Sequence, residues 1–299
     1  MIIVALKGGL GNQMFQYATA RGICKGNEKV VLDLSFLKKH SIGTNSFTPR
    51  SYELSIFSEI NARLASNLLY RILYGSNLIF KIGRKLFHLK VKKVAQHENE
   101  FVTALQNGHR SIYLDGYFQS EKYFFHIRKE LLEEFKFPGL AENDLDALNV
   151  LTKIRSIRNA TAIHVRRGDY LKPLIQEYHG VMPISYFKNA IDKIEALVSD
   201  PYYFIFSDDP LWCAENFKFI DDRMEIVDSK DSKNAWKDMF LMSQCEHHII
   251  SNSSFGWWGA WLSSRGGYKF APLRWFNPEI AKFNIEDFVP KTWHLVSNV

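Results

Sequence analysis

The chain has 299 residues, which suits one large or two medium domains, because a single hydrophobic core stops growing at about 250 to 300 residues. Hydrophobic residues make up 46% of it and charged residues 23%, a composition that excludes general disorder. No apolar run reaches the roughly 18 residues of a membrane-spanning helix, and the amino terminus lacks the features of a signal peptide. We therefore expect two domains and a cytoplasmic protein.

The net charge of +6 is concentrated in one segment. Residues 63–93 contain eight lysines and arginines and no acidic residue, so the rest of the chain carries about −2. Because the excess is not spread over the fold, we expect no nucleic-acid binding. The segment mixes these cations with leucine, isoleucine and aromatic residues, a pattern typical of a helix lying on an anionic membrane. A helical excursion with solvated lysines fits the same pattern.

The amino terminus predicts a β-turn-α opening. Residues 1–7 are an apolar strand, the glycine-rich turn GGLGNQ begins at Gly8, and a helix is expected over 12–25, followed by a strand over 29–34. Glycines let backbone amides approach a ligand, and the helix offers its positive end to a phosphate. Gly9 and Asn12 are therefore candidate ligand contacts, although a turn required only by packing is the alternative.

The second half predicts a doubly wound parallel sheet. After a strand over 110–119, a helix over 121–135 and a break at Pro138, strands and helices alternate from 161 to 271. We place the boundary between an amino-terminal domain, 1–155, and a carboxyl-terminal domain, 156–299, near residue 155.

Polar clusters follow three strands of the second half. They read HVRRGDY from His164, FSDD from Phe206, and SNSSFGWW from Ser251. In a parallel sheet these strand ends share one edge, which is where ligands of open α/β folds bind. Arginine grips phosphate through a planar fork of donors, so Arg166 and Arg167 indicate a phosphate-bearing ligand. A pair of arginines engaged in structural salt bridges at the strand end is the alternative.

Two further features bear on the ligand. Ser253 and Ser254 precede a helix whose free amides suit a diphosphate, although ordinary capping accounts for serines there too. Asp208 and Asp209 could bind a cation, contact ribose hydroxyls or cap the next helix. Because two arginines can neutralise a leaving diphosphate, we expect no metal requirement.

Five motifs follow one another along the chain, in the order GGLGNQMFQYA, DGYFQSEKYF, HVRRGDY, FSDD and SNSSFGWWGAWL. Taken together, they resemble the motifs of the α-1,2-fucosyltransferases of glycosyltransferase family 11. The resemblance implies a GT-B fold, with two Rossmann-like domains facing across a cleft, the first on the acceptor side and the second binding GDP-fucose. It implies no cofactor beyond GDP-β-L-fucose as donor, and an inverting transfer to the 2-hydroxyl of a β-galactoside-terminated glycan, free or lipid-linked.

The resemblance also implies roles for individual residues at the matching positions of this chain. Arg166 resembles the arginine on the donor β-phosphate, His164 and Asp169 belong to the same motif, and Asp208 falls where related enzymes hold the nucleoside. The complete set of candidate donor contacts is Gly9, Asn12, His164, Arg166, Arg167, Ser207, Asp208, Ser253, Ser254 and Phe255.

The acceptor hydroxyl must lose a proton, and Asp115, Glu121 and Asp169 are the candidate general bases beside Arg166 as the charge-stabilising group. Neither motif nor spacing chooses among the three. Two other readings compete with the fucosyltransferase: a GT-B enzyme using another nucleotide sugar, and a non-catalytic module that binds sugar nucleotides or glycans. Contact of 63–93 with the inner face of an anionic membrane is a separate hypothesis.

Overall fold

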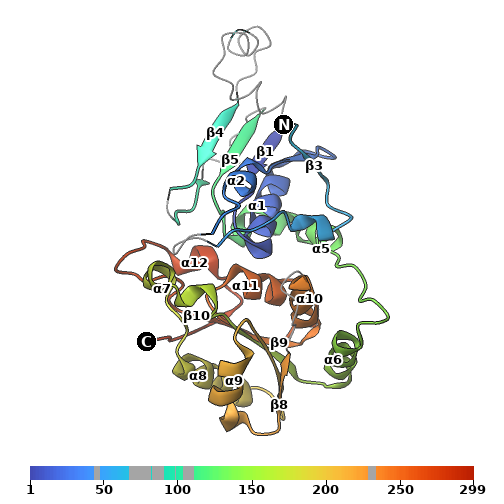
Figure 1. Cartoon of the computed structure of the whole chain (residues 1–299), viewed down its shortest axis with the longest axis vertical. Coiled ribbons are helices and arrows are strands. Elements are labelled where there is room, and N and C mark those ends of the chain that lie inside the picture. Colours follow the sequence, from blue (N-terminus) through green and yellow to red (C-terminus); the bar gives the residue numbers. More distant parts are fainter. Residues whose placement is uncertain (44–47, 67–81, 83–90, 98, 104–110, 228–233) are drawn as a thin grey trace. The chain divides into compact units, whose positions relative to one another are not determined.

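The structure is a computed structural model that describes residues 1–299 except 44–47, 67–81, 83–90, 98, 104–110 and 228–233. The chain divides into two compact units, 1–43 with 49–136, and 137–299 with 44–48. Each unit is a parallel sheet with helices (Figure 1). The expected α/β architecture of two Rossmann-like units is therefore confirmed.

The first unit contains a five-stranded sheet in the order β3-β2-β1-β5-β4. Its elements are β1 (Ile2–Ala5), α1 (Leu10–Ile23), β2 (Val30–Asp33), α2 (Ser35–Lys39), β3 (Ala62–Leu64), β4 (Lys92–Ala95), β5 (Ile112–Asp115) and α5 (Arg128–Glu134). The opening β1-α1-β2 unit matches the prediction within three residues at each boundary. Helix α1 is buried along most of its length, including Gln13 and Gln16, so its polar side chains must find partners inside the protein.

The helix expected over 121–135 forms only at its end, as α5. Glu121–Tyr123 and Phe125–Ile127 are short 3₁₀ turns instead. The α1 helix approaches this stretch so closely that a Cβ on Gly22 would lie 2.5 Å from the carbonyl oxygen of Tyr123. This contact with the backbone, which the local sequence does not reveal, accompanies the interruption of the helix. Ser120 caps the first of these turns by accepting a hydrogen bond from the amide of Lys122.

The second unit contains a six-stranded sheet in the order β11-β10-β9-β6-β7-β8. Its elements are α6 (Leu145–Ser156), β6 (Ala160–Val165), α7 (Pro173–His179), α8 (Ile184–Glu195), β7 (Tyr202–Ser207), α9 (Pro210–Asn216), β8 (Met224–Val227), α10 (Trp236–Gln244), β9 (His247–Ile250), α11 (Ser254–Trp261), β10 (Lys269–Pro272), α12 (Ile285–Phe288) and β11 (His294–Val296). The alternation of strands and helices expected from 161 to 271 is confirmed. Helices α7 and α12 and strand β11 were not anticipated.

Both faces of this sheet are buried, because successive side chains of a strand point to opposite sides. On β6, Ile163 and Val165 join one hydrophobic core, whereas Ala160 and Ala162 join the other. By the same alternation, His164 lies on the face of Ala162.

Helix α6 belongs to the second unit, which begins at Phe137, whereas the sequence placed the boundary near residue 155. Leu151 and Ile154 of α6 pack into a core of the second unit. Asp144, which caps α6, also forms an ion pair with Lys237. The break at Pro138 is therefore the feature that coincides with the division of the chain.

Most of the basic segment 63–93 lies outside the described residues. Its two ends are strands, with Arg63 and Leu64 in β3 and Lys92 and Lys93 in β4. Among the described residues, no helix combines the length and the apolar character needed to cross a membrane.

Candidate functional site

The three polar strand ends of the second unit meet at one edge, as predicted. Strands β9, β6 and β7 are neighbours in the sheet, and all three run parallel. Ser251 fixes the first two ends together, because its hydroxyl donates to the carbonyl of His164 (2.8 Å) and accepts from the amide of Arg166 (3.1 Å). The backbone that carries Arg166 is therefore held by the strand beside it.

Arg166 lies between two carboxylates. Its guanidinium forms ion pairs with Asp169 at 2.5 Å and Asp208 at 2.8 Å, and its side chain is 22% exposed. Burial alone would lower the pKa of Arg166, but the charges of Asp208 and Asp169 outweigh it, so the pKa is raised. Arg166 is a permanently charged cation that these contacts hold in place.

Arg167 has a separate set of contacts. Its Nε atom lies 3.1 Å from Asp209, and its guanidinium lies over the ring of Trp212 at 4.0 Å from the centroid. Its backbone amide donates to Asp208 at 2.8 Å. Arg167 is therefore fixed against α9, whereas Arg166 is linked to the turn that follows β6.

The turn itself requires a glycine at position 168. A Cβ on Gly168 would lie 2.6 Å from Oδ2 of Asp208, which is closer than real contacts allow. Beside it, Asp209 caps α9 by accepting from the amide of Trp212, and the hydroxyl of Ser207 accepts from the amide of Asp209. Of the alternatives for FSDD, Asp209 is a helix cap, and Asp208 bridges the two arginines.

His164 lies under this edge against α11. It is 5% exposed, and its Nδ1 atom has no hydrogen-bond partner among the described residues. Burial and the charge of Arg166 lower the pKa of His164 to about 3, so its ring is neutral at pH 7. A Cβ on Gly256 would lie 2.6 Å from Nδ1, so the glycine lets α11 pack directly on the histidine.

Helix α11 begins at Ser254, and Ser253 is its cap. The hydroxyl of Ser253 accepts from the amide of Phe255 at 3.3 Å, which is the ordinary capping contact. The ring of Phe255 lies 5.8 Å from that of His164. The expected contacts His164, Arg166, Asp208, Ser253 and Phe255 thus belong to one edge of one sheet.

The sequence reasoning missed a group of residues behind this edge. Tyr170 stacks on His179 with ring centroids 4.7 Å apart, and its hydroxyl donates to the carbonyl of Asn252. The Nδ2 atom of Asn252 donates to the carbonyls of His179 and Trp275. Tyr170 and Asn252 lie inside the motifs and could have been noted, whereas His179 comes from α7, which the sequence did not reveal.

The glycine-rich turn of the first unit is closed by the protein's own side chains. The amide of Leu10, at the start of α1, donates to a carboxylate oxygen of Glu53 at 3.0 Å. Gln13 donates to the carbonyls of Gly8 and Ser51 and accepts from the amide of Glu53. A negative charge therefore already lies at the amino terminus of α1, where the sequence suggested a phosphate.

Asn12 and Gly9 differ in their surroundings. The side-chain amide of Gln119 donates to Oδ1 of Asn12 at 2.6 Å. A Cβ on Gly9 would meet only the side chain of Arg50, at 3.7 Å, so packing does not require this glycine. Position 8 does require a glycine, because its φ of +73° is in the left-handed region.

Two of the three candidate bases lie in the first unit. Asp115, at the end of β5, pairs with Lys7 and with Lys93 at 2.8 Å. Burial would raise the pKa of Asp115, but these two lysines outweigh it, so its pKa is lowered and the carboxylate is a weaker base than a free one. Glu121 lies in a 3₁₀ turn and is half-buried. The third, Asp169, is bound to Arg166.

In the part of the chain that the structure describes, no group of three or more histidine, cysteine, aspartate or glutamate side chains could hold a metal ion. All three cysteines are free thiols, of which Cys213 and Cys245 are buried and Cys24 is half-buried.

The two parallel-sheet units define the fold class, which is the GT-B fold. The structure of Arabidopsis thaliana FUT1, an arginine-to-lysine mutant in complex with GDP, has the same fold. It superposes with a TM-score of 0.50 at 13% identity, over 90% of this chain and 69% of that one.

Sequence comparisons place the chain within that class. The model of Glycosyl transferase family 11 matches residues 1–297, so the chain belongs to this family, and the predicted resemblance is confirmed. An alpha-1,2-colitosyltransferase of Escherichia coli is 30% identical over 98% of both chains. A galactoside 2-alpha-L-fucosyltransferase of Mus musculus is 25% identical over 88% of this chain and 64% of its own length.

Proposed function

We propose that this chain is an inverting α-1,2-fucosyltransferase, which moves L-fucose from GDP-β-L-fucose to the 2-hydroxyl of a β-galactoside-terminated glycan. The observation that carries the proposal is the edge of the second unit, where Arg166 lies between two carboxylates beside the start of α11. The mouse relative is named for the same transfer. The expected domain roles, donor in the second unit and acceptor in the first, are part of the proposal.

In the proposed reaction the acceptor oxygen attacks C1 of fucose. The bond between C1 and the β-phosphate oxygen breaks, and GDP leaves with the electron pair. Charge therefore develops on the diphosphate, and Arg166 lowers the barrier if it exchanges a carboxylate contact for a phosphate oxygen. Because Asp169 and Asp208 hold the guanidinium in place beforehand, it need not be ordered when the donor binds.

The other residues of the edge have distinct proposed roles. Asp208 and Ser207 contact the nucleoside, and Arg167 supports Asp208 through its backbone amide. Ser253, Ser254 and Phe255 present the amides of α11 to the diphosphate. His164, neutral and buried, supports the start of that helix.

In the first unit, Gly9 and Asn12 are proposed to face the fucose rather than the phosphates. The carboxylate of Glu53 accepts from the amide of Leu10, and it would repel a second anion there. A sugar is neutral and escapes this repulsion. The acceptor proton goes to Asp115, Glu121 or Asp169, or to water. We propose no metal, because two arginines and helix amides can offset the charge of leaving GDP.

The test is a transfer assay that offers GDP-fucose with a set of galactosides and maps the linkage of the product. The proposal predicts an α-1,2 bond to galactose, with full activity in the presence of a chelator. Thermal stabilisation by GDP, but not by UDP or ADP, separates this enzyme from one using another nucleotide sugar. Binding of GDP without transfer to any acceptor would favour the non-catalytic module.

A second candidate is transfer of colitose, favoured by the Escherichia coli colitosyltransferase that matches over 98% of this chain. Colitose lacks one ring hydroxyl of L-fucose. A site that hydrogen-bonds a hydroxyl group strongly rejects the analogue without it, so the two donors should differ sharply in kcat/KM. Parallel assays with GDP-fucose and GDP-colitose decide which is the substrate.

Location is a separate proposal. We propose a cytoplasmic enzyme whose basic segment 63–93 contacts the anionic inner face of a membrane. Co-sedimentation with vesicles containing phosphatidylserine should fall when Lys85, Lys90, Lys92 and Lys93 are replaced by glutamate. Binding that survives this change would contradict an electrostatic contact.

A further inference from the structure

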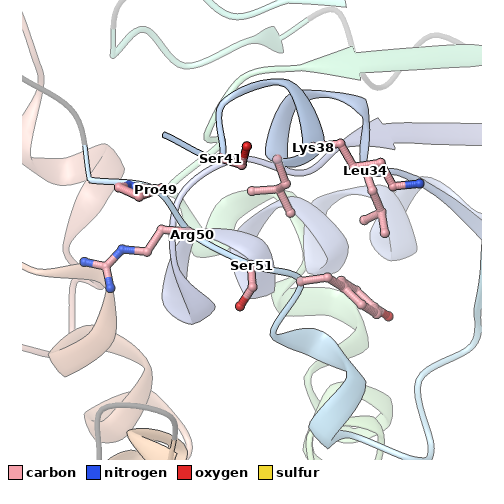
Figure 2. A pocket seen from close by; sticks show the side chains of 8 residues that line it. Leu34, Lys38, Ser41, Pro49, Arg50 and Ser51 are labelled. Atoms are coloured by element: carbon pink, nitrogen blue, oxygen red, sulfur yellow. The ribbon is translucent and has the colours of Figure 1, made fainter. Parts of the chain in front are cut away.

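The pocket of the first unit contains two cations that do not converge on one point. It lies between α2 and residues 49–52 and has a volume of about 520 Å³. The charged ends of Lys38 and Arg50 point away from each other (Figure 2), and the charge of Arg50 also acts on the carboxylate of Glu53. The aromatic side chains behind Arg166 in the second unit differ, because their contacts all lead to the proposed donor site.

Tyr170 is the residue that joins these side chains to Arg166. The guanidinium carbon of Arg166 lies over the ring of Tyr170, 5.7 Å from its centroid, which is within reach of a cation–π contact. This contact uses the face of the ring and none of the N–H donors of the guanidinium. Arg166 can therefore keep it while one of its N–H groups exchanges a carboxylate oxygen for a phosphate oxygen.

The ring of Tyr170 is itself held at two points. His179 of α7 stacks on it with ring centroids 4.7 Å apart, and the ring of His179 in turn lies 5.3 Å from that of Phe276. The hydroxyl of Tyr170 donates to the carbonyl of Asn252 at 3.0 Å. Because both its ring and its hydroxyl are engaged, Tyr170 is an ordered surface for the cation beside it.

Asn252 connects this tyrosine to the start of α11. It lies in the turn between β9 and α11 and is 1% exposed. Its Nδ2 atom donates to the carbonyls of His179 at 2.7 Å and Trp275 at 3.0 Å, while its own carbonyl accepts from Tyr170. Tyr170 therefore joins the turn that carries Arg166 to the turn that precedes α11, and the proposed function assigns the diphosphate to both.

We propose that Tyr170 is a positioning residue, which holds the guanidinium of Arg166 where the diphosphate of the donor binds, and that His179 supports its ring. This inference rests on the proposed function and adds two residues to its machinery. Tyr170 acts through Arg166, so it need not touch the donor. The motif resemblance gave neither residue a role.

The experiment is a double-mutant cycle between Tyr170 and Arg166, measured by calorimetric titration with GDP and by steady-state transfer. Tyr170→Leu should weaken GDP binding and lower kcat about tenfold each, the size of a partly desolvated cation–π contact. In the Arg166→Ala background, the same change should have an effect of less than about twofold, because the residue through which it acts is gone. A loss caused only by a disturbed fold would be equal in the two backgrounds.

Conservative variants separate the contacts of the ring from that of the hydroxyl. Tyr170→Phe keeps the ring and should weaken GDP binding only about threefold. His179→Leu should also weaken it about threefold, and His179→Phe, which keeps a stacked ring, should restore most of the loss. Thermal unfolding checks that each variant is folded.

Tyr268→Leu is the matched control. Tyr268 also stacks on a histidine, His247, with ring centroids 5.7 Å apart. These two residues lie where β9 and β10 begin, whereas the proposed site follows the ends of the strands. Replacing Tyr268 should therefore leave the affinity for GDP unchanged.

Equal effects of Tyr170→Leu in the two backgrounds would overturn the proposal, as would unchanged affinity of the Tyr170→Leu protein for GDP. The two readouts separate this failure from failure of the proposed function. Coupled losses of GDP affinity, without transfer to any acceptor, would keep the positioning of Arg166 and refute the transferase. Transfer by the Tyr170→Leu protein at the unmodified rate would refute the positioning and keep the transferase.

Discussion

Each unit has a strand that leads through a turn toward a helix, but the two turns are closed in opposite ways. In the first unit, the amide at the start of α1 is bound by the carboxylate of Glu53, and Gln13 links the turn to Ser51 through hydrogen bonds to the carbonyls of Gly8 and Ser51. In the second, Arg166 in the turn after β6 lies between carboxylates, and α11, which follows the neighbouring strand β9, packs on the neutral His164. A glycine-rich turn before a helix can thus be occupied by a carboxylate of the protein itself, and we propose that the anion site lies at the edge of the second unit.

The largest expected effect is that of Arg166→Ala. Losing a preorganised charge that stabilises a leaving diphosphate should reduce kcat by roughly 100- to 1000-fold. Steady-state transfer assays measure it. Arg158→Ala, at an exposed arginine of the same unit, is the control and should retain full activity. An Arg166→Ala enzyme with near-normal turnover would mean that the salt bridges of Arg166 are structural only.

Acid should destabilise the second unit through its buried histidines. Burial is the main cause that lowers the pKa of His164 to about 3, and the nearby charge of Arg166 adds to it. Burial also lowers the pKa of His179 to about 4, where the charge of Asp169 opposes the shift and that of Arg166 adds to it. Below pH 6.5 the unfolded chain therefore takes up protons that the folded chain does not. Each histidine should reduce the free energy of unfolding by about 1.4 kcal/mol at pH 5.5.

Urea denaturation at pH 7.5 and pH 5.5 measures this loss. Hydrogen exchange then locates it, because amides of β6 and β9 should lose protection before those of β1. Equal stability at the two pH values would mean that both histidines can take up a proton in the folded protein.

Two glycine substitutions sharpen the contrast between the units. Gly256→Ala should reduce the free energy of unfolding by about 1 to 3 kcal/mol, because its Cβ would meet the buried ring of His164 at 2.6 Å. Gly9→Ala should change it by less than about 0.5 kcal/mol, because its Cβ meets only the side chain of Arg50 at 3.7 Å. Thermal and urea unfolding of both variants provide the comparison.

Assays with GDP-fucose and with GDP test whether Gly9 contacts the donor sugar. If Gly9 faces the fucose, Gly9→Ala should raise the KM for GDP-fucose several-fold and leave the affinity for GDP unchanged. A lower affinity for GDP itself would instead bring the diphosphate to the glycine-rich turn.

Glu53→Gln should reduce stability modestly and leave donor binding unchanged. The variant keeps an acceptor for the amide of Leu10 but loses its charge, so we expect a loss of about 1 kcal/mol in the free energy of unfolding. Its affinity for GDP should not change. Tighter binding of GDP would show that Glu53 had been repelling a phosphate at the start of α1.

The sequence revealed the features that are local. Alternating strands and helices predicted the second sheet, and the shared edge of parallel strands brought Arg166, Asp208 and Ser253 together. Short strands at the sheet margins, such as β3 and β11, were missed because three residues are too few to show a periodicity.

Contacts between distant residues could not be predicted. The residues next to Leu10 in the sequence do not indicate that Glu53 will bind its amide. Likewise, the residues next to Asp115 do not indicate the two lysines that lower its pKa. The helix expected over 121–135 failed for the same reason, because its interruption accompanies close contact with Gly22. Only the fold brings such pairs together.

The most direct test of the central claim is calorimetric titration of GDP into the unmodified protein, Arg166→Ala and Arg158→Ala. The account predicts that GDP binds the unmodified protein and the Arg158 variant alike, and that loss of Arg166 weakens binding at least about tenfold, as for a charge-assisted hydrogen bond. Equal affinity of all three proteins for GDP would contradict the assignment of the donor to this edge.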